Sequence, residues 1–287
     1  MPEFISKLQH KTYEKGEFSD EKARNLPDTL ALIKNFPWEE ERPLTAVDLT
    51  GPSVTIKDED LNYLKVGLYF NGKYCLYYLD RDNHLYEYYA PDITDVYKKV
   101  TDFFNGQLDL SAFEKHFFNI GNQGHFVNKS FIYEVKLWRV VLLSWPFILF
   151  FLIFLIFFIA IITTPAPFYV VLVPIIFVLL LGGTLTYIFN KYVKCSAQTL
   201  QISKGNNNFS FNDGSGENVY NKNEIKEIII YKPAGGRNPN DFYVYEIYFK
   251  DGSMIKFSNM LISDIVFGNK FPSDLYRYGD KNSFRKL

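Results

Sequence analysis

The feature that most constrains this chain is a stretch of 51 residues, from Val140 to Asn190, without a single Asp, Glu, Lys, Arg or His. A helix that crosses a bilayer needs about 20 apolar residues, so the stretch can hold two such helices and a turn. The turn is predicted at residues 163–167, where Pro165 and Pro167 interrupt helical geometry. We therefore predict a transmembrane hairpin over residues 137–192, with spans at about 140–162 and 168–189.

The alternative is a buried helical hairpin inside a large soluble core. A soluble core helix rarely stays apolar around its whole circumference for six turns. Residues 147–162 read FILFFLIFLIFFIAII and have no polar face. Insertion into a membrane is therefore the preferred interpretation.

The residues that flank the spans predict their orientation. Both flanks are basic, the turn carries no charge, and positively charged flanks stay in the cytoplasm. We expect the protein in the cytoplasmic (inner) membrane, with both termini cytoplasmic. The basic residues are Lys129, Lys136 and Arg139 before the spans and Lys191, Lys194 and Lys204 after them, and the aromatic residues expected at the interfaces are Trp138, Trp145, Tyr169, Tyr187 and Tyr192.

Gly182 and Gly183 in the second span form a small-residue surface that a neighbouring helix can approach closely. We predict that this surface is the helix–helix contact between the two spans. Neither span contains an ionisable residue at membrane depth. Pumps and transporters usually need one, so these two classes are disfavoured.

Composition and motifs exclude several other functions. The net charge is −1, which gives no indication of nucleic-acid binding. Cys75 and Cys195 are far apart in sequence and form no metal or redox motif. Nucleophile-elbow, phosphate-loop, dinucleotide-binding and zinc-protease motifs are absent from the sequence. Acidic residues at 58–60 and 80–82 lack calcium-loop spacing and are interpreted as solvated turns. We predict no catalytic residue, no cofactor, no metal and no enzymatic activity.

The N-terminal half is predicted to form a small cytoplasmic α+β domain over residues 44–136, preceded by a polar segment or linker over residues 1–43. Within it, strands are expected at 63–70, 73–80 and 84–90, and Asn71-Gly72 predicts a tight hairpin turn. Asp92 or Thr94 is expected to cap a helix that runs to about residue 104. Ser111 with Glu114 fits a capping box for a second helix that ends near residue 118.

Two sets of residues are candidate partner sites. Alternate residues of a strand face opposite sides, so about half of the tyrosines in the predicted strands should face away from the core. These six form a possible partner surface: Tyr74, Tyr77, Tyr78, Tyr86, Tyr88 and Tyr89. Lys226, Lys232 and Arg237 are possible contacts for anionic lipid headgroups, each worth about 1 kcal/mol near a membrane. Ordinary strand packing and a solvated loop are the respective alternatives.

Residues 195–287 are predicted to form a cytoplasmic β-rich domain, with strands near 199–202, 208–211, 224–231, 242–249 and 254–257. Two spans followed by TLQI, FSF, YNKNEIKEIIIYK and YEIYFKDGSMIKFS resemble the bacterial pleckstrin-homology-like (PH-like) two-span membrane proteins. The residues that carry this resemblance are Glu224, Ile225, Glu246, Phe249, Asp251, Gly252, Ile255 and Ser258. The resemblance implies a small antiparallel barrel that acts as a binding module. A PH domain closes with an amphipathic helix, and residues 260–287 show no clean helical period.

The predicted fold class is thus an α+β membrane protein: a two-helix transmembrane hairpin between a small N-terminal α+β domain and a C-terminal antiparallel β, PH-like barrel. The predicted function is a non-enzymatic membrane adaptor that binds a protein or an anionic lipid, and no nucleic acid. The runs FPWEEERPLTAVDLTGPSVTI and YLKVGLYFNGKYCLYYLD are similar to immunity-type domains, which makes neutralisation of a secreted antibacterial toxin one alternative. A membrane-perforating effector with a cytoplasmic sensor is another.

Overall fold

The computed structural model describes residues 2–42, 48–117, 120–163, 167–232 and 243–279. The chain forms two compact units. The first comprises residues 1–130 with 203–206, and the second comprises residues 131–202 with 207–287. Arg237 and the centre of the predicted 163–167 turn lie outside the described residues.

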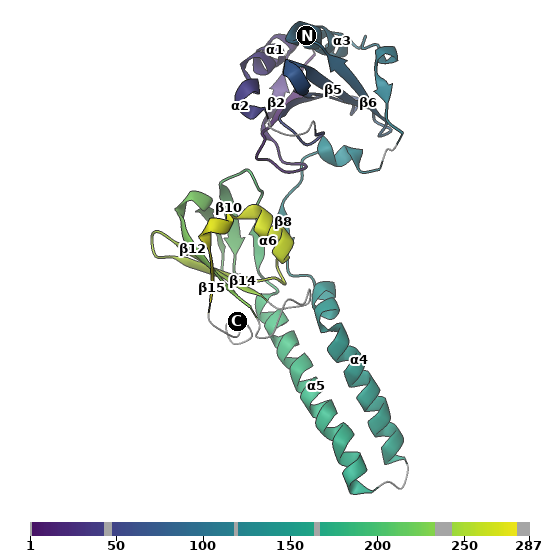
Figure 1. Ribbon diagram of the computed structural model, residues 1–287, viewed down its shortest axis with the longest axis vertical. Coiled ribbons are helices and arrows are strands. Elements are labelled where there is room, and N and C mark those ends of the chain that lie inside the picture. Colours follow the sequence, from purple (N-terminus) through teal and green to yellow (C-terminus); the bar gives the residue numbers. More distant parts are fainter. Residues whose placement is uncertain (1, 43–47, 118–119, 164–166, 233–242, 280–287) are drawn as a thin grey trace. The chain divides into compact units, whose positions relative to one another are not determined.

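The first unit is built on a seven-stranded antiparallel sheet in the order β2-β1-β3-β4-β5-β6-β7. Its strands are β1 (Phe4–Gln9), β2 (Ser19–Arg24), β3 (Ser53–Lys57), β4 (Tyr63–Leu68), β5 (Tyr74–Leu79), β6 (Leu85–Ala90) and β7 (Glu114–Lys115). Its helices are α1 (Leu26–Asn35), α2 (Trp38–Glu41) and α3 (Ile93–Phe104), and its 3-10 turns are η1 (Phe70–Gly72), η2 (Leu110–Ala112) and η3 (Asn122–His125). Figure 1 labels β2, β5, β6 and the three helices of this unit.

The predicted meander is present as β4, β5 and β6. Tyr63 pairs with Leu79 and Tyr74 pairs with Ala90, so the three strands are in continuous register. Asn71 and Gly72 both adopt positive φ, at 56° and 77°, as the tight connection requires. The predicted helix is present as α3. The Asp92 carboxylate caps its start by accepting hydrogen bonds from the Thr94 and Asp95 amides.

The two faces of the sheet are covered differently. Leu64, Val66 and their neighbours pack with residues of α1 and α3 in one apolar cluster. On the opposite face, Phe126 is fully buried in a smaller cluster with Tyr63, Cys75 and Tyr77. The segment that contains η3 therefore covers part of the second face, and the sheet has side chains buried on both sides.

Two expectations for this unit were wrong. Residues 1–43 were expected to be a polar segment, yet β1 pairs with both β2 and β3 inside the sheet. Pro27 occupies the first turn of α1, where its missing amide hydrogen costs nothing. Ser111 lies in the short turn η2, capped by Asp109, and the strand β7 takes the place of the second helix.

The second unit contains two long helices, α4 (Leu137–Ile162) and α5 (Phe168–Cys195), which pack side by side (Figure 1). Phe154 and Phe177 stack between them with ring centroids 4.3 Å apart. Both helices are long and apolar enough to cross a membrane, and only 6% of each apolar window is buried within the protein. Most of their apolar side chains therefore face outward.

The rest of this unit consists of two four-stranded sheets, in the orders β11-β10-β9-β8 and β14-β13-β12-β15. The strands are β8 (Ile132–Glu134), β9 (Thr199–Gln201), β10 (Asn208–Asn212), β11 (Glu217–Asn221), β12 (Ile225–Tyr231), β13 (Val244–Phe249), β14 (Met254–Ser258) and β15 (Tyr276–Tyr278). The remaining elements are α6 (Asp264–Lys270) and the turns η4 (Lys222–Glu224) and η5 (Ser273–Leu275).

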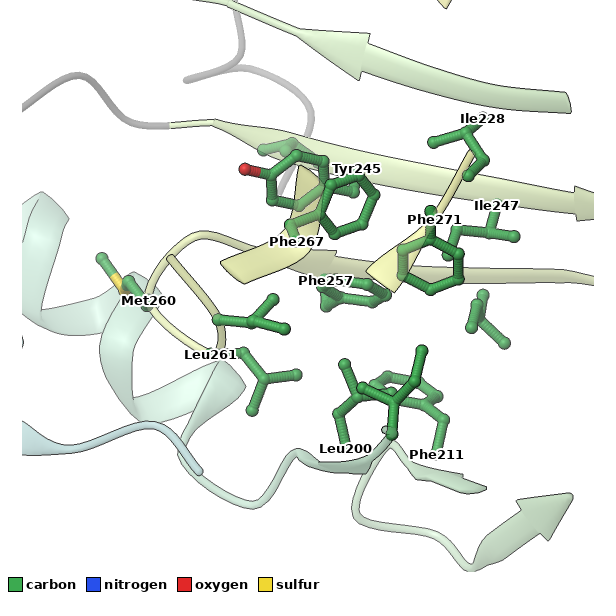
Figure 2. Packing of buried hydrophobic residues seen from close by; sticks show 14 of the residues in the cluster. Leu200, Phe211, Ile228, Tyr245, Ile247, Phe257, Met260, Leu261, Phe267 and Phe271 are labelled. Carbon is green, nitrogen blue, oxygen red and sulfur yellow. The ribbon is translucent and has the colours of Figure 1, made fainter. Parts of the chain in front are cut away.

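Side chains from both sheets fill a common core (Figure 2). Leu200 and Phe211 come from one sheet, and Tyr245 and Phe257 from the other. Phe267 of α6 stacks on Tyr245 with centroids 4.0 Å apart. A short helix therefore does cap the core, although its seven residues are too few to show a helical period in the sequence.

The helical hairpin is inserted between two paired strands. Strand β8 precedes α4, β9 follows α5, and the two strands pair antiparallel with Ile132 opposite Gln201 and Glu134 opposite Thr199. Residues 132–134 were assigned from sequence to the N-terminal domain, but their pairing places them in the second unit. The β-rich domain therefore starts before the hairpin and continues after it.

Candidate functional site

The base of the hairpin, where α4 begins and α5 ends, is built into the core of the two-sheet domain. Val140 from α4 and Cys195 from α5 are buried among the core residues. The Arg139 guanidinium donates to the Leu261 carbonyl oxygen at 3.1 Å, and the Gln198 amide donates to the Lys256 carbonyl oxygen at 3.3 Å. These contacts fix the two-sheet domain to the ends of both helices.

The predicted headgroup residues Lys226 and Lys232 do not lie together. Lys226 is in β12 and Lys232 directly follows it, so the six-residue spacing separates them by about 20 Å along the strand. Tyr231, next to Lys232, pairs with Val244, and Val244 pairs with Ser258 shortly before Leu261. Lys232 therefore lies at the end of the sheet nearest the hairpin base, and Lys226 lies at the far end.

Lys232 is exposed and has aromatic neighbours. Its ammonium lies 4.1 Å from the ring centroid of Tyr278 and 5.9 Å from that of Tyr243. Such contacts hold an exposed cation in place while leaving it able to meet an anion. Arg139 and Trp138 stand at the start of α4 at the same end of the domain, with the guanidinium 5.6 Å from the indole.

A buried carboxylate lies on the outer side of the second sheet. Glu246 is 4% exposed, accepts hydrogen bonds from the Tyr231 and Tyr248 hydroxyls at 3.0 Å each, and pairs with Lys256 at 3.5 Å. The hydrogen bond to Glu246 raises the pKa of Tyr248 to about 12. Because its hydrogen bonds are satisfied within the protein, this cluster stabilises the sheet and offers no acid or base to a substrate.

The six candidate tyrosines of the first unit divide between the two faces of its sheet. Four of them are half-buried on the side of α1 and α3: Tyr74, Tyr78, Tyr86 and Tyr88. Tyr74 packs edge-on against Trp38, and the Tyr88 hydroxyl donates to Asp95 at 2.7 Å. Tyr77 is buried on the opposite face. Among the six, Tyr89 alone is classed as exposed, at 44%.

Tyr89 belongs to an aromatic group with the half-buried Tyr69 and the exposed Phe70, which sequence reasoning did not single out. Its ring lies 4.5 Å from that of Tyr69, which in turn lies 5.3 Å from that of Phe70. Phe70 is 55% exposed. Tyr69 and Phe70 fall at the turn between β4 and β5, and the turn signal of Asn71-Gly72 could have pointed to their exposure.

One cluster brings a thiol, a carboxylate and an imidazole together. The Cys75 thiol donates to Glu87 Oε1 at 3.2 Å, and His116 Nε2 lies 2.6 Å from Glu87 Oε2. In a Cys–His pair the imidazole contacts the sulfur, but here the Glu87 carboxylate stands between the sulfur and the imidazole. Burial, with a smaller contribution from Glu87, raises the pKa of the Cys75 thiol. Burial therefore disfavours the thiolate, which is the nucleophilic form of cysteine.

Asp80, Asp82 and His84 lie close enough together to contact one ion at the β5–β6 turn. However, the Asp80 carboxylate already accepts from the Asp82 amide at 2.9 Å, the His84 amide at 2.8 Å and the His84 ring at 2.9 Å. These bonds account for the closeness of the three side chains, because they hold a turn together. The interpretation from sequence was also a turn.

The two glycines of α5 have different surroundings. A Cβ at Gly182 would lie 3.3 Å from the Phe151 ring of α4, whereas a Cβ at Gly183 would meet nothing within 4 Å. Gly182 therefore lies at the contact between the helices. Gly183 instead lines a groove of about 410 Å³ with Phe147, Leu180 and Tyr187, among others.

A family model described as a PH domain matches residues 132–270. The match begins at β8 and ends with α6, so it contains both sheets and the helical hairpin between them. A PH domain indicates a general binding or adaptor role towards a protein or a lipid. The comparisons with curated proteins and with solved structures give no match. The PH-like resemblance is thus confirmed for this region, while the immunity-type resemblance of the first unit stays a prediction.

Proposed function

We propose that this chain is a two-span protein of the bacterial cytoplasmic membrane, whose PH-like domain is held at the cytoplasmic surface as a non-enzymatic binding module. The ligand class is a protein or an anionic lipid beside the membrane. The first unit supplies a second cytoplasmic binding domain on the same chain.

The outward-facing apolar surface of α4 and α5 supports insertion. A soluble protein rarely exposes contiguous apolar patches larger than a few hundred Å², because water disfavours them. Here nearly all of two apolar windows, Ser144–Ile162 and Val170–Cys195, is unburied. At about 1.5 Å per residue, the 26 residues of α4 are long enough to cross the roughly 30 Å hydrocarbon layer.

The pairing of β8 with β9 is the observation that carries the proposal. Only Val135 and Lys136 separate β8 from α4, and only residues 196–198 separate α5 from β9. A module joined by two such short connections, with Val140 and Cys195 in its core, cannot move freely away from the helices. Its hairpin-side end, which carries Lys232, is therefore held where lipid headgroups lie.

Lys226 and Lys232 offer a matched test of lipid contact, because both are exposed lysines on one strand at opposite ends. The full-length protein would be reconstituted in vesicles that contain a photo-activatable phosphatidylglycerol. We expect K232A to reduce crosslinking several-fold and K226A to leave it unchanged. Equal crosslinking of both variants and wild type, or equal labelling by a phosphatidylcholine probe, would contradict an anionic headgroup contact.

The protein-binding arm is tested by affinity capture of the tagged full-length chain from mild-detergent membranes, followed by mass spectrometry. Because Phe70 and Tyr89 are exposed and the half-buried Tyr69 lies between them, a stoichiometric partner should be lost in the F70A/Y89A variant. A variant at the half-buried Tyr86 on the other face, Y86F, serves as the control. If neither the lipid test nor the capture gives a specific ligand, the binding-module proposal fails.

A further inference from the structure

The second face of the first sheet is covered by a segment that we call the strap, residues 121–129. The strap contains η3 and the fully buried Phe126, whose ring lies 5.8 Å from that of Tyr63 on β4. Its own backbone bonds are few: the Phe126 and Val127 amides donate to the Gln123 carbonyl oxygen, and the Lys129 amide donates to Gly16. Side chains from the body of the domain must therefore hold the strap in place.

Three lysine amino groups do so, each by donating to an oxygen of the strap. Lys15 Nζ donates to the Gly121 carbonyl at 2.8 Å, Lys65 Nζ to the His125 carbonyl at 3.1 Å, and Lys7 Nζ to Asn128 Oδ1 at 2.9 Å. The lysines come from the β1–β2 loop, from β4 and from β1, respectively. The strap is thus held at its beginning, middle and end by lysine amino groups.

Lys65 is the central and most buried of the three, at 1% exposure. Its other two donors go to Gln9 Oε1 at 2.7 Å and to the Leu49 carbonyl at 2.6 Å. No carboxylate pairs with it among the residues that the structure describes. A charge on Lys65 is therefore buried without a paired carboxylate, and the hydroxyl of its cross-strand neighbour Thr55 is buried without a hydrogen-bond partner among the described residues.

Burial and the surrounding positive charges disfavour the protonated forms of Lys65, Lys7 and His125. Burial lowers the pKa of Lys65 to about 7 and that of Lys7 to about 8. Burial and the nearby lysines lower the pKa of His125, whose Nδ1 lies 2.7 Å from the Thr50 hydroxyl, to about 4. The charged groups that face these three residues are Lys15, Lys57 and Lys129, which add to the positive charge, and Asp48 and Glu21, which oppose it.

We propose that the strap is an acid-released clamp, docked on the sheet in alkaline solution and increasingly free of it as the pH falls. Undocking returns Lys65, Lys7 and His125 to water, where each binds a proton more readily. Because each docked pKa lies below its solvated value of 10.5, 10.5 or 6.5, undocking takes up protons and acid favours it. The lysines make undocking depend on pH between about pH 10.5 and 7. His125 makes it depend on pH between 6.5 and about 4.

Release would uncover the face of the sheet on which Phe126 packs against Tyr63. This inference stands independently of whether the helical hairpin enters a membrane.

Hydrogen exchange of the full-length protein in detergent, corrected for intrinsic rates, tests the clamp. We expect protection of the Val127 and Lys129 amides to fall at least about ten-fold from pH 9 to pH 7, and again from pH 6.5 to pH 4.5. K65M should abolish most of the first fall, and H125N, which keeps a side chain able to bond Thr50, should abolish the second. K98M, at an exposed lysine of α3, should change neither.

Three outcomes would overturn the proposal. Protection of the strap could be independent of pH, or K65M and H125N could both retain the wild-type dependence. Alternatively, amides of α3 could lose protection together with those of the strap, which would show that the whole unit opens. Should K65M fail to fold, K65Q and the lower pH window of H125N still decide the question.

Discussion

Glu134, the last residue of β8, pairs with Thr199, the first residue of β9, and the entire helical hairpin lies between them in the chain. The hairpin therefore takes the place of a turn between two strands. Connections of only two and three residues join the helices to the β8–β9 ladder. This relationship makes the two helices part of the PH-like domain, and the PH family match over residues 132–270 spans the same elements.

The closing helix α6 should be essential to the PH-like domain. Phe267 is 2% exposed and stacks on Tyr245, so F267A leaves a cavity and should cost about 3–5 kcal/mol of unfolding free energy. Ile265 is 80% exposed on the same helix, and I265A should stay within about 0.5 kcal/mol of wild type. Denaturant unfolding in detergent, followed by hydrogen exchange of β12–β14 amides, measures both. Similar losses in the two variants would show that α6 is not a buried cap.

The two adjacent glycines of α5 should respond differently to the same substitution. A leucine at 182 must displace Phe151 of the facing helix, so G182L should cost about 1–3 kcal/mol. At 183 a side chain enters open space, and G183L should have little effect on the hairpin itself. Thermal unfolding of the purified variants measures the difference. A greater loss in G183L would contradict this packing and indicate a partner on the groove face.

Both thiols should be unreactive in the folded protein. Cys75 and Cys195 are free and buried, and burial raises the pKa of the Cys75 thiol far above neutrality. Thiolates are the reactive form, so neither residue should react with a maleimide at pH 8 until denaturant is added. Mass spectrometry of the labelled protein provides the readout. Rapid modification of Cys75 under native conditions would mean that the Cys75–Glu87–His116 cluster opens and would revive a chemical role for it.

Strong local patterns in the sequence predicted their elements well. The uncharged stretch from Val140 to Asn190 predicted the length of the helical hairpin. Asn71-Gly72 and the alternating residues on either side predicted the register from Tyr63 to Ala90. Asp92 capped α3 as expected. In each of these cases, residues close together in sequence determine the structure.

Elements that depend on distant partners were not predictable. Strand β8 has three residues and finds its partner only beyond the hairpin, so no local pattern marks it. β1 places Lys7 and Gln9 on a buried face, which made residues 1–43 read as a polar segment. Lys65 likewise looked like an ordinary strand lysine, because the three oxygens that it binds come from Gln9, Leu49 and His125.

For the candidate sites too, the sequence predicted local features and missed those that depend on distant residues. Four of the six candidate tyrosines lie on the side of α1 and α3, and the cover on the second face comes from the strap, which sequence alone did not place there. The proximity of Lys226 and Lys232 in sequence suggested one cluster, whereas an extended strand separates them. Lys232 remains the better candidate for membrane contact because of its position near the hairpin base.

Cysteine accessibility tests the central claim, a membrane hairpin built into a cytoplasmic PH-like domain, most directly. In a C75S/C195S background, single cysteines would be placed at the exposed positions Thr163, at the hairpin tip, and Ile265, on α6. Intact cells, with the outer membrane made permeable, would be treated with a membrane-impermeant maleimide. We predict that T163C is labelled and that I265C is labelled only after the cytoplasmic membrane is opened. Labelling of both positions from the same side, or release of the protein by alkaline carbonate, would contradict the account.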